Sequence, residues 1–349
     1  MGRVHGLTIN SEIPFGFSTV PDAGGTVAGD AVLLVRRGPA RDNLVGPPDG
    51  ELVATCPLPG GEPYFDLTSE PGSYRVRFQR RCECVVRADL REVVVYPAPG
   101  TTDDELAMLV AGTTLGVLLN LADHLVLHAS AFVLDAGTED PQAVAVLGES
   151  GAGKSTFVAL ACAAGATFLA DDALRVDLEP TGPVARAGHS ELRLRRPVGD
   201  AVCALLGVPT SADATTQATV PVAAPLGVRV TNDDHLAVQL GHAALDRVPL
   251  GACVLVRQRR DLVRPAVRKL ALPDAVLALA RSPRVVAWRL QDRLAHHFTG
   301  AVQIARSLEV LELALPVGAV PRLDVVREAL ALIGPHCVLP RNARKVTSP

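Results

Sequence analysis

Lysine is scarce in this chain. Only Lys154, Lys269 and Lys345 occur among 349 residues, in a sequence rich in Arg, Ala, Val and Pro. We attribute this bias to genome composition and not to function. Because lysine is so rare, Lys154 is conspicuous.

A large net charge is also missing. The chain has 34 Lys and Arg against 37 Asp and Glu, a formal net charge of -3, and a pI near 6.3. This balance argues against a broad surface for a polyanion, so no nucleic-acid partner is expected. We interpret the local arginine clusters as solvated faces, with contact to phosphate or peptide as the alternative. The clusters are Arg75, Arg77, Arg80 and Arg81, and Arg193, Arg195 and Arg196.

Paired cysteine motifs are absent. The seven cysteines are odd in number, scattered, and form no C-x-x-C pair or regular spacing with histidine. We interpret them as reduced thiols of a cytoplasmic protein. Cys82 and Cys84 alternate on a predicted strand and so share a face, but two ligands alone do not make a zinc site.

No segment predicts a signal peptide or a membrane span. Met1 is not followed by a charged and then apolar stretch. The most apolar window, 106–122, is short for a bilayer and runs directly into Asp123 and His124. We therefore expect a buried helix there, no membrane association, and a cytoplasmic location.

A glycine-rich turn follows an apolar strand at 143–147. Residues 148–155 match G-x-x-x-x-G-K-[ST], the pattern of a phosphate-binding loop (P-loop, Walker A). Its glycines let successive backbone N–H groups point inward, and the helix that follows adds its positive N-terminal end. The alternative is a chance match in a glycine-rich turn, which the flanking strand and helix argue against.

The loop predicts a bound nucleoside triphosphate, ATP or GTP, together with Mg²⁺. Lys154 would reach the β- and γ-phosphates, and the Ser155 hydroxyl would coordinate Mg²⁺. The predicted nucleotide-binding residues are Gly148, Glu149, Ser150, Gly151, Ala152, Gly153, Lys154, Ser155 and Thr156.

Hydrophobic periodicity predicts a β-rich N-terminal domain, a P-loop domain and a frayed tail, at 1–100, 101–340 and 341–349. Short β-prone runs fill the first domain, at 4–9, 31–36, 51–56, 74–80 and 93–96. A helix is predicted over 101–122, and a capping box at 102–105 begins it.

The P-loop domain is expected to hold the remaining elements. A buried strand at 125–134 contains His128 and should pair antiparallel with 143–147, because the connection is too short for a crossover helix. After the loop, a helix over 155–164 stops at Gly165, and a strand at 167–170 ends in Asp171 and Asp172. We further predict a loop at 211–225, strands at 253–257 and 308–315, and helices at 273–281, 296–307 and 323–333.

The two adjacent carboxylates are candidates for chemistry. Phosphoryl transfer needs a metal clamp on the phosphates and a group that orients or deprotonates the acceptor. Asp171 and Asp172 are placed to supply both, since the strand that ends in them points at the loop. An exposed Asp pair at a turn is the alternative. His128, taken alone, is more often a satisfied core residue than a functional one.

Three segments together resemble the HPr kinase/phosphorylase group. They are Leu127-His128-Ala129-Ser130, the loop from Gly148 to Thr156, and Leu169-Ala170-Asp171-Asp172. The resemblance is greater to the HPr-kinase-related proteins associated with peptide modification, including lasso-peptide kinases. It implies an α/β fold of the HPr-kinase and phosphoenolpyruvate-carboxykinase type, a mixed β-sheet with flanking helices. An ordinary parallel P-loop sheet is the alternative.

The resemblance also implies roles for individual residues. Asp171 would be the base for the acceptor hydroxyl, Asp172 and Ser155 would hold Mg²⁺, and His128 would lie beside the transferring phosphate. A homo-oligomer is a further expectation from the family.

The chain departs from the family in two places. Glu191 and Arg193 are only weak counterparts of the acidic and basic pair that follows the Asp-Asp motif. The glycine- and arginine-rich C-terminal signature of the true HPr kinases has no convincing counterpart, which argues against HPr as substrate and against the reverse phosphorolysis.

The leading hypothesis is a kinase that uses Mg·ATP to phosphorylate a hydroxyl, serine first, on a peptide or a small molecule. Its catalytic residues would be Lys154, His128 and Asp171. A different class is a nucleotide-gated binding or assembly protein that hydrolyses ATP slowly or not at all. The sequence has no L-S-G-G-Q-like segment of an ABC ATPase and no N-K-x-D of a GTPase. Loss of ATP that depends on an acceptor separates the kinase from the switch.

Overall fold

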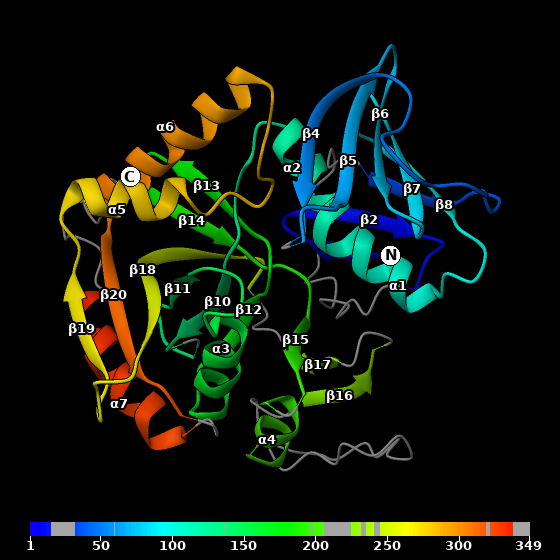
Figure 1. Cartoon of the computed structure of the whole chain (residues 1–349). Coiled ribbons are helices and arrows are strands. Elements are labelled where there is room, and N and C mark those ends of the chain that lie inside the picture. The colour runs from blue at the N-terminus through cyan, green and yellow to red at the C-terminus, as the bar shows by residue number, and fades with distance from the viewer. Residues whose placement is uncertain are drawn as a thin grey trace. The chain divides into compact units, whose positions relative to one another are not determined.

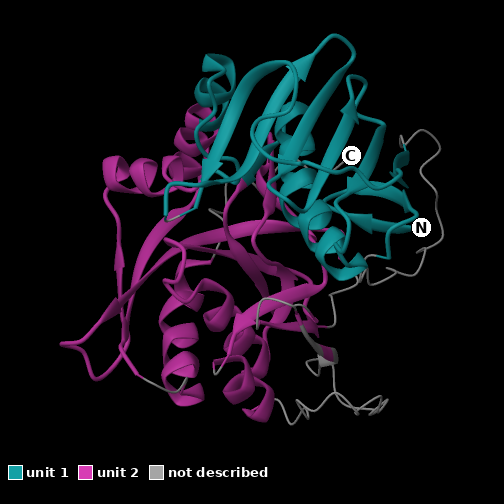
Figure 2. Ribbon diagram, turned by 45° about the vertical axis from the view of Figure 1, so that its right-hand side comes forward, with its two compact units in different colours: residues 1–126, 283–297 teal, residues 127–282, 298–349 magenta. Residues whose placement is uncertain are grey.

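A computed structural model describes residues 1–14, 32–58, 60–135, 137–196, 198–205, 225–231, 235–240, 245–318 and 322–337. The chain divides into two compact units, which are residues 1–126 with 283–297 (unit 1) and residues 127–282 with 298–349 (unit 2) (Figure 2). Each unit has a hydrophobic core of its own. Unit 1 extends past the boundary expected near residue 100, to residue 126. It also includes residues 283–297, which the sequence pattern did not assign to this domain. The predicted tail and all of the predicted loop before Pro225 lie outside the described residues.

Unit 1 is built on an eight-stranded sheet with the order β1-β2-β3-β8-β7-β6-β5-β4 (Figure 1). β3 is parallel to both neighbours, and the other pairs are antiparallel. The single strand predicted at 4–9 is wrong: His5 and Gly6 have φ of 52° and 74°, the conformation of a two-residue type I′ hairpin turn. The strands are β1 (Gly2–Val4), β2 (Leu7–Ser11), β3 (Val32–Arg37), β4 (Glu51–Pro57), β5 (Pro63–Glu70), β6 (Ser73–Phe78), β7 (Cys82–Arg87) and β8 (Glu92–Pro97).

The strand β6 is apolar on one face of this sheet and charged on the other. Along β6, Val76 and Phe78 are buried in the core, while Arg75 and Arg77 lie on the opposite face, as predicted. Both arginines donate to the carboxylate of Glu83 on β7, at 3.1 Å from Arg75 and 2.8 Å from the Arg77 Nε. The Glu83 side chain is only 1% exposed. These two arginines therefore neutralise a buried carboxylate, which corrects the expectation of a merely solvated face.

A helix from Asp103 to Leu121 packs its apolar side into the unit 1 core. It consists of α1 (Asp103–Met108), a π-helical turn (Leu109–Thr114) and α2 (Leu115–Leu121). The predicted capping box is confirmed, since the Thr102 hydroxyl accepts from the Glu105 N–H at 3.3 Å and the Glu105 carboxylate accepts from the Thr102 N–H at 3.0 Å. The helix is long and apolar enough to cross a membrane, but 72% of its apolar window is buried inside the protein, as in a core helix.

Unit 2 is built on a nine-stranded mixed sheet. Its order is β12-β10-β11-β18-β14-β13-β9, with β20 beside β18 and β19 beside β20. β10 and β11 pair antiparallel, as predicted, whereas β11 is parallel to β18. The expected mixed α/β architecture is therefore present, and the wholly parallel alternative is wrong. The strands are β9 (Leu125–Leu127), β10 (Ser130–Leu134), β11 (Gln142–Leu147), β12 (Thr167–Ala170), β13 (Leu174–Glu179), β14 (Gly182–Arg186), β18 (Arg247–Arg259), β19 (Ala266–Lys269) and β20 (Glu309–Pro316).

The strand predicted at 125–134 is interrupted at His128. β9 ends at Leu127 and β10 begins at Ser130, and the two strands hold different places in the sheet. The break coincides with a contact to a distant part of the chain, because the His128 N–H donates to the carbonyl of Ser282 at 2.8 Å.

The helices of unit 2 agree with the sequence pattern in most places. α3 (Lys154–Ala163) ends before Gly165, whose φ is 110°, and packs Phe157 against Phe132 of β10 with ring centroids 6.1 Å apart. α5 (Leu272–Ala280) and α7 (Leu323–Ile333) lie where predicted, and α6 (Gln291–Ser307) begins earlier than expected. The sequence did not predict α4 (Val198–Leu205) or a three-stranded sheet of β15 (Glu191–Arg195), β17 (His235–Leu240) and β16 (Pro225–Val230).

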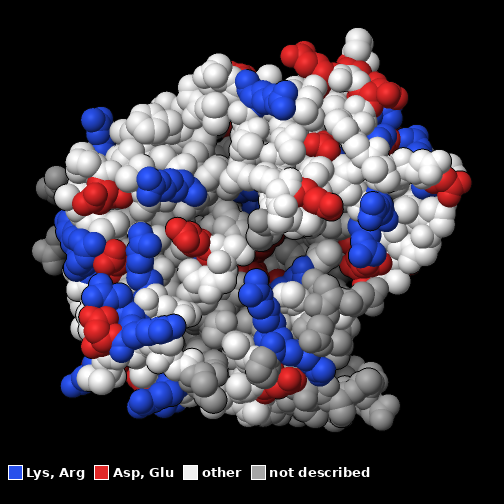
Figure 3. Space-filling view, in the orientation of Figure 1, with Lys and Arg blue, Asp and Glu red and all other residues white. Residues whose placement is uncertain are grey.

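Charged side chains of both signs are interspersed on the face shown in Figure 3. Ion pairs among the described residues include Arg268 with Glu312 at 2.9 Å and Lys269 with Glu309 at 2.5 Å. The expectation that no nucleic acid binds stays a prediction.

Candidate active site

Three neighbouring strands bring the predicted residues to one edge of the unit 2 sheet. β10 lies between β11 and β12, with Ser130 opposite Val146 and Ala131 opposite Ala170. Because β10 is antiparallel to both neighbours, its start lies beside their ends. The segment that contains His128 and Ser130 therefore meets the Asp171-Asp172 pair next to the loop that follows β11.

The loop of residues 148–153 has a backbone that favours glycine. Gly148, Gly151 and Gly153 have φ of 152°, 81° and 97°. A Cβ added at Gly148 would lie 3.1 Å from the Cβ of Ala152, and one at Gly153 would lie 3.3 Å from the Gln258 Nε2. A loop of this form before a helix N-terminus is the arrangement in which backbone N–H groups hold a phosphate.

Lys154, the first residue of α3, lies folded against the loop. Its Nζ donates to the carbonyl oxygens of Gly148 at 2.9 Å and Glu149 at 3.2 Å. The residue is only 7% exposed, and lysine is rarely buried to that degree without such partners. The fold thus fixes a positive charge inside the loop.

Asp171 is held by three hydrogen-bond donors. Its Oδ1 accepts from the hydroxyls of Ser130 at 2.5 Å and Ser155 at 2.8 Å, and its Oδ2 accepts from the backbone N–H of Arg193 at 3.2 Å. Burial raises the pKa of the Asp171 carboxyl above its ordinary value, and the charge of Asp172 adds to that rise, while the three donors oppose it.

Asp172 has a different environment from its neighbour. Its side chain is 47% exposed, and its Oδ1 lies 3.2 Å from the Nδ1 of His128, whose side chain is 32% exposed. Its φ of 66° is uncommon for a residue other than glycine. The structure therefore brings His128 to Asp172 and brings Ser155 to Asp171.

Two supports of the site were missed from the sequence. Ser130 appeared there only as part of a motif, although a buried hydroxyl on an otherwise apolar strand is a signal for a polar partner. The segment with Glu191 and Arg193 forms β15, and the structure joins it to the site through the backbone N–H of Arg193. Nothing in the side-chain pattern marks that contact.

The site has oxygen ligands suited to Mg²⁺. Among the described residues, no group of three or more His, Cys, Asp or Glu is placed to hold a metal ion. Mg²⁺ usually takes only one or two carboxylates and completes its shell with phosphate oxygens and water. Ser155, Asp171 and Asp172 supply donors of this kind, and so they fit an ion that binds together with a nucleotide.

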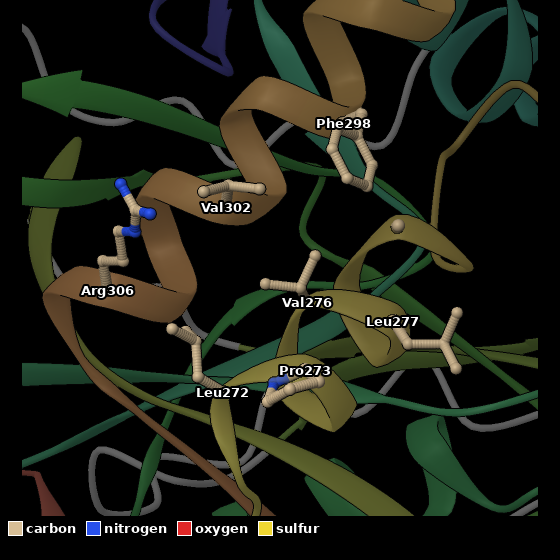
Figure 4. Close-up of a pocket in the computed structure, with 8 residues that line it drawn as sticks. Leu272, Pro273, Val276, Leu277, Phe298, Val302 and Arg306 are labelled. Carbon is tan, nitrogen blue, oxygen red and sulfur yellow. The ribbon is translucent and has the colours of Figure 1, made fainter.

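A concave feature of unit 2, separate from this site, lies between α5 and α6 (Figure 4). This groove has a volume of about 500 Å³ and an apolar lining in which Phe298 is 55% exposed. None of the residues of the site described above lines it. The lining residues are Leu272, Pro273, Val276, Leu277, Ala280, Phe298, Val302 and Arg306.

Comparisons with known proteins include a distant likeness among solved structures. No protein-family model and no curated protein matches the chain. Among solved structures, the chain is similar to the Hpr(Ser) kinase/phosphatase from Coxiella burnetii, with 12% identity, coverage of 60% of this chain and 95% of that chain, and a TM-score of 0.27. At that TM-score the likeness carries no conclusion about fold or activity, so a functional proposal depends on the geometry of the site.

Proposed function

We propose that this protein is a kinase that uses Mg·ATP to phosphorylate a hydroxyl group. The observation that carries the proposal is the meeting of a glycine-rich loop, which holds Lys154 and Ser155, with two carboxylates at the end of a nearby strand of the same sheet. Phosphoryl transfer depends on positioning and charge stabilisation, and these groups supply both.

The loop is the part that would bind the nucleotide. Its backbone N–H groups and the N-terminus of α3 favour the phosphates, and Lys154 would leave its carbonyl partners for the β- and γ-phosphates. Ser155 and the Asp171-Asp172 pair would hold Mg²⁺, which neutralises the charge that develops during transfer. Between them, the two carboxylates also supply a proton acceptor for the incoming hydroxyl.

The acceptor would be an alcohol, with serine of a peptide as the first candidate and a small molecule as the second. A base beside the γ-phosphate is useful only when a hydroxyl lies in line with it, and a kinase must keep water from that place. The partly exposed Asp172 and His128 leave such a hydroxyl a route to the site from solvent.

The competing function is a nucleotide-gated binding or assembly protein. A P-loop with a carboxylate beside its serine would serve such a protein equally well. The two functions differ in how ATP is consumed. A kinase consumes ATP in proportion to the amount of acceptor that it phosphorylates, and a switch does not.

The deciding experiment supplies purified protein with Mg·ATP and a panel of acceptors. The panel should contain peptides encoded beside the gene and free serine, and mass spectrometry should score the addition of one phosphate. We expect slow ATP loss without an acceptor and fast loss with the right one. If no acceptor gains phosphate while bound ATP changes the affinity for a protein partner, the switch replaces the kinase.

A further inference from the structure

The groove between α5 and α6 leaves large apolar side chains in contact with solvent. Phe298 of α6 is 55% exposed, and Leu272 and Leu277 of α5 are each 46% exposed. Single apolar side chains are common on protein surfaces, whereas a concave cluster of them marks a place where another molecule binds. The groove therefore has the character of a binding surface.

One cation lies at an end of this groove. Figure 4 shows Arg306 and Leu272 at one end, and Phe298 and Leu277 at the other. Arg306 is exposed, and none of the described residues pairs with its guanidinium group. None of the described lining residues is acidic, and Asp274 of α5 does not line the groove. A complementary occupant is therefore apolar along most of its length and carries a carboxylate at the Arg306 end.

The other end of the groove is joined to the phosphate site. Ala280, the last residue of α5, lines the groove. Two residues later, the carbonyl oxygen of Ser282 accepts from the His128 N–H at 2.8 Å, and the His128 Nδ1 lies 3.2 Å from the Asp172 Oδ1. Two residues of chain span at most about 7 Å. A peptide that leaves the groove at Ala280 is therefore close to the acidic pair.

We propose that this groove docks the peptide acceptor of the kinase, with apolar side chains against α5 and α6 and an Asp or Glu side chain on Arg306. The inference rests on the proposed function and selects the peptide over the small molecule as acceptor. The serine that receives the phosphate lies outside the groove, beyond the end at Ala280.

The length of α5 sets how much of the peptide the groove contacts. The helix has nine residues, which at 1.5 Å per residue makes it about 13 Å long. An extended segment covers that distance with about four residues, at about 3.3 Å each. The docking segment is therefore short, and about four residues or more separate its acidic residue from the serine.

A second copy of the chain fits the groove less well than a peptide. A two-fold contact would set groove against groove. Two concave surfaces do not fill one another, and the described lining offers no carboxylate to Arg306. A convex segment with an acidic residue of its own supplies both.

Peptide kinetics of groove variants test the proposal. Loss of a docking contact weakens binding of substrate and transition state equally, so it raises KM for the peptide and leaves kcat unchanged. We expect Phe298→Ala and Arg306→Glu each to raise that KM by about 10-fold, with Mg·ATP affinity unchanged. Val263→Ala and Arg327→Glu are the matched controls and should behave as the wild type, because these exposed side chains do not line the groove.

A library of serine peptides with glutamate or lysine at each position locates the acidic contact. The wild type should prefer glutamate at one position about four residues or more from the serine, and Arg306→Glu should prefer lysine there. Arg327→Glu should keep the wild-type preference. Free serine has no docking segment, so the wild type should use it no better than Arg306→Glu does. An identical preference in the wild type and Arg306→Glu overturns the inference.

Peptide binding without nucleotide separates failure of the docking site from failure of the kinase. Fluorescence anisotropy would use two labelled peptides of leucine, alanine and glycine, one with glutamate at its amino end and one with glutamate at its carboxyl end. We expect one of them to bind the wild type and to lose about 10-fold in affinity for Arg306→Glu.

Three results contradict the inference in different ways. If the wild type phosphorylates peptides and the groove variants keep its KM and its anisotropy, the docking site is wrong and the kinase function stands. If a labelled peptide binds at Arg306 but no peptide gains phosphate, the groove is a peptide site of the nucleotide-gated switch, and its role in docking an acceptor falls with the kinase. A lower particle mass of Phe298→Ala in sedimentation, with KM unchanged, would assign the groove to a second copy.

Discussion

At the scale of single residues, Lys154 shows how the fold uses a scarce side chain. It is buried, and its ammonium group donates hydrogen bonds to two carbonyl oxygens of the loop. On nucleotide binding it would exchange these partners for phosphate oxygens. Lys269 on β19 is exposed and pairs with Glu309 at 2.5 Å. One lysine is therefore part of a candidate binding site, and the other is part of a surface ion pair. Only Lys154 should affect nucleotide binding.

We predict that Lys154→Ala lowers Mg·ATP affinity or turnover by about 10- to 100-fold, since a hydrogen bond to a charged group is worth ~1.5–3 kcal/mol. Calorimetry and turnover assays measure the loss. Lys269→Ala is the control and should behave as the wild type, because exposed ion pairs contribute little. Equal Mg·ATP affinity and turnover in the wild type, Lys154→Ala and Lys269→Ala would exclude the phosphate-loop assignment.

At the scale of elements, the packing of α3 on β10 sets the geometry of the loop. Phe132 of β10 is completely buried and meets Phe157 of α3 edge to face, with ring centroids 6.1 Å apart. The same strand carries Ser130 at its start. The contact thus ties the helix that contains Lys154 and Ser155 to the strand that positions Asp171.

Phe132→Ala should destabilise the protein by about 3–5 kcal/mol, the range for removal of a buried phenylalanine. Phe298→Ala, in the groove between α5 and α6, should cost less than about 1 kcal/mol, because its side chain is largely exposed (Figure 4). Urea denaturation of both variants makes the comparison. Similar losses for the two would show that the α3–β10 contact does not hold the core together.

Element by element, the sequence predicted what local chemistry controls. The capping box at Thr102, the strand before the loop and the stop at Gly165 follow from side-chain hydrogen bonding, apolar runs and glycine φ, and all three are present. The hairpin turn at His5-Gly6 was missed because the residues before and after it both favour strands. The whole run was therefore predicted as one strand. The break at His128 was missed because its cause is a hydrogen bond to Ser282, far away in the sequence.

At the scale of the whole molecule, the chain has two hydrophobic cores and seven free cysteines. Cys82 and Cys84 lie in unit 1, and Cys162 and Cys253 lie in unit 2, all four buried. Burial raises the pKa of Cys162 and of Cys253 to about 12, and a hydrogen bond with Cys84, together with burial, raises the pKa of Cys82. Cys56 alone is half-buried.

Thiol labelling tests this arrangement. The thiolate is the reactive form, so a raised pKa leaves almost none of it at pH 8. We expect iodoacetamide to modify Cys56 in the native protein and the six buried cysteines only in denaturant, with the buried cysteines of one unit becoming reactive at the same concentration. Mass spectrometry of digested samples locates each label. Rapid native labelling of Cys162 would contradict the packing of unit 2, and an isolated disulfide would contradict the prediction of reduced thiols in a cytoplasmic protein.

The sequence by itself determined the phosphate-loop pattern, the acidic pair at the end of a strand and the mixed α/β class, because each follows from local spacing, turn chemistry or the length of a connection. Only the tertiary structure decided which groups touch. It placed β10 between β11 and β12, so that Ser155 and Ser130 donate hydrogen bonds to Asp171. It also brought His128 beside Asp172 and made 283–297 part of unit 1. The physical reason is that strand order and register depend on burying apolar side chains from distant parts of the chain together, and local periodicity does not contain that information.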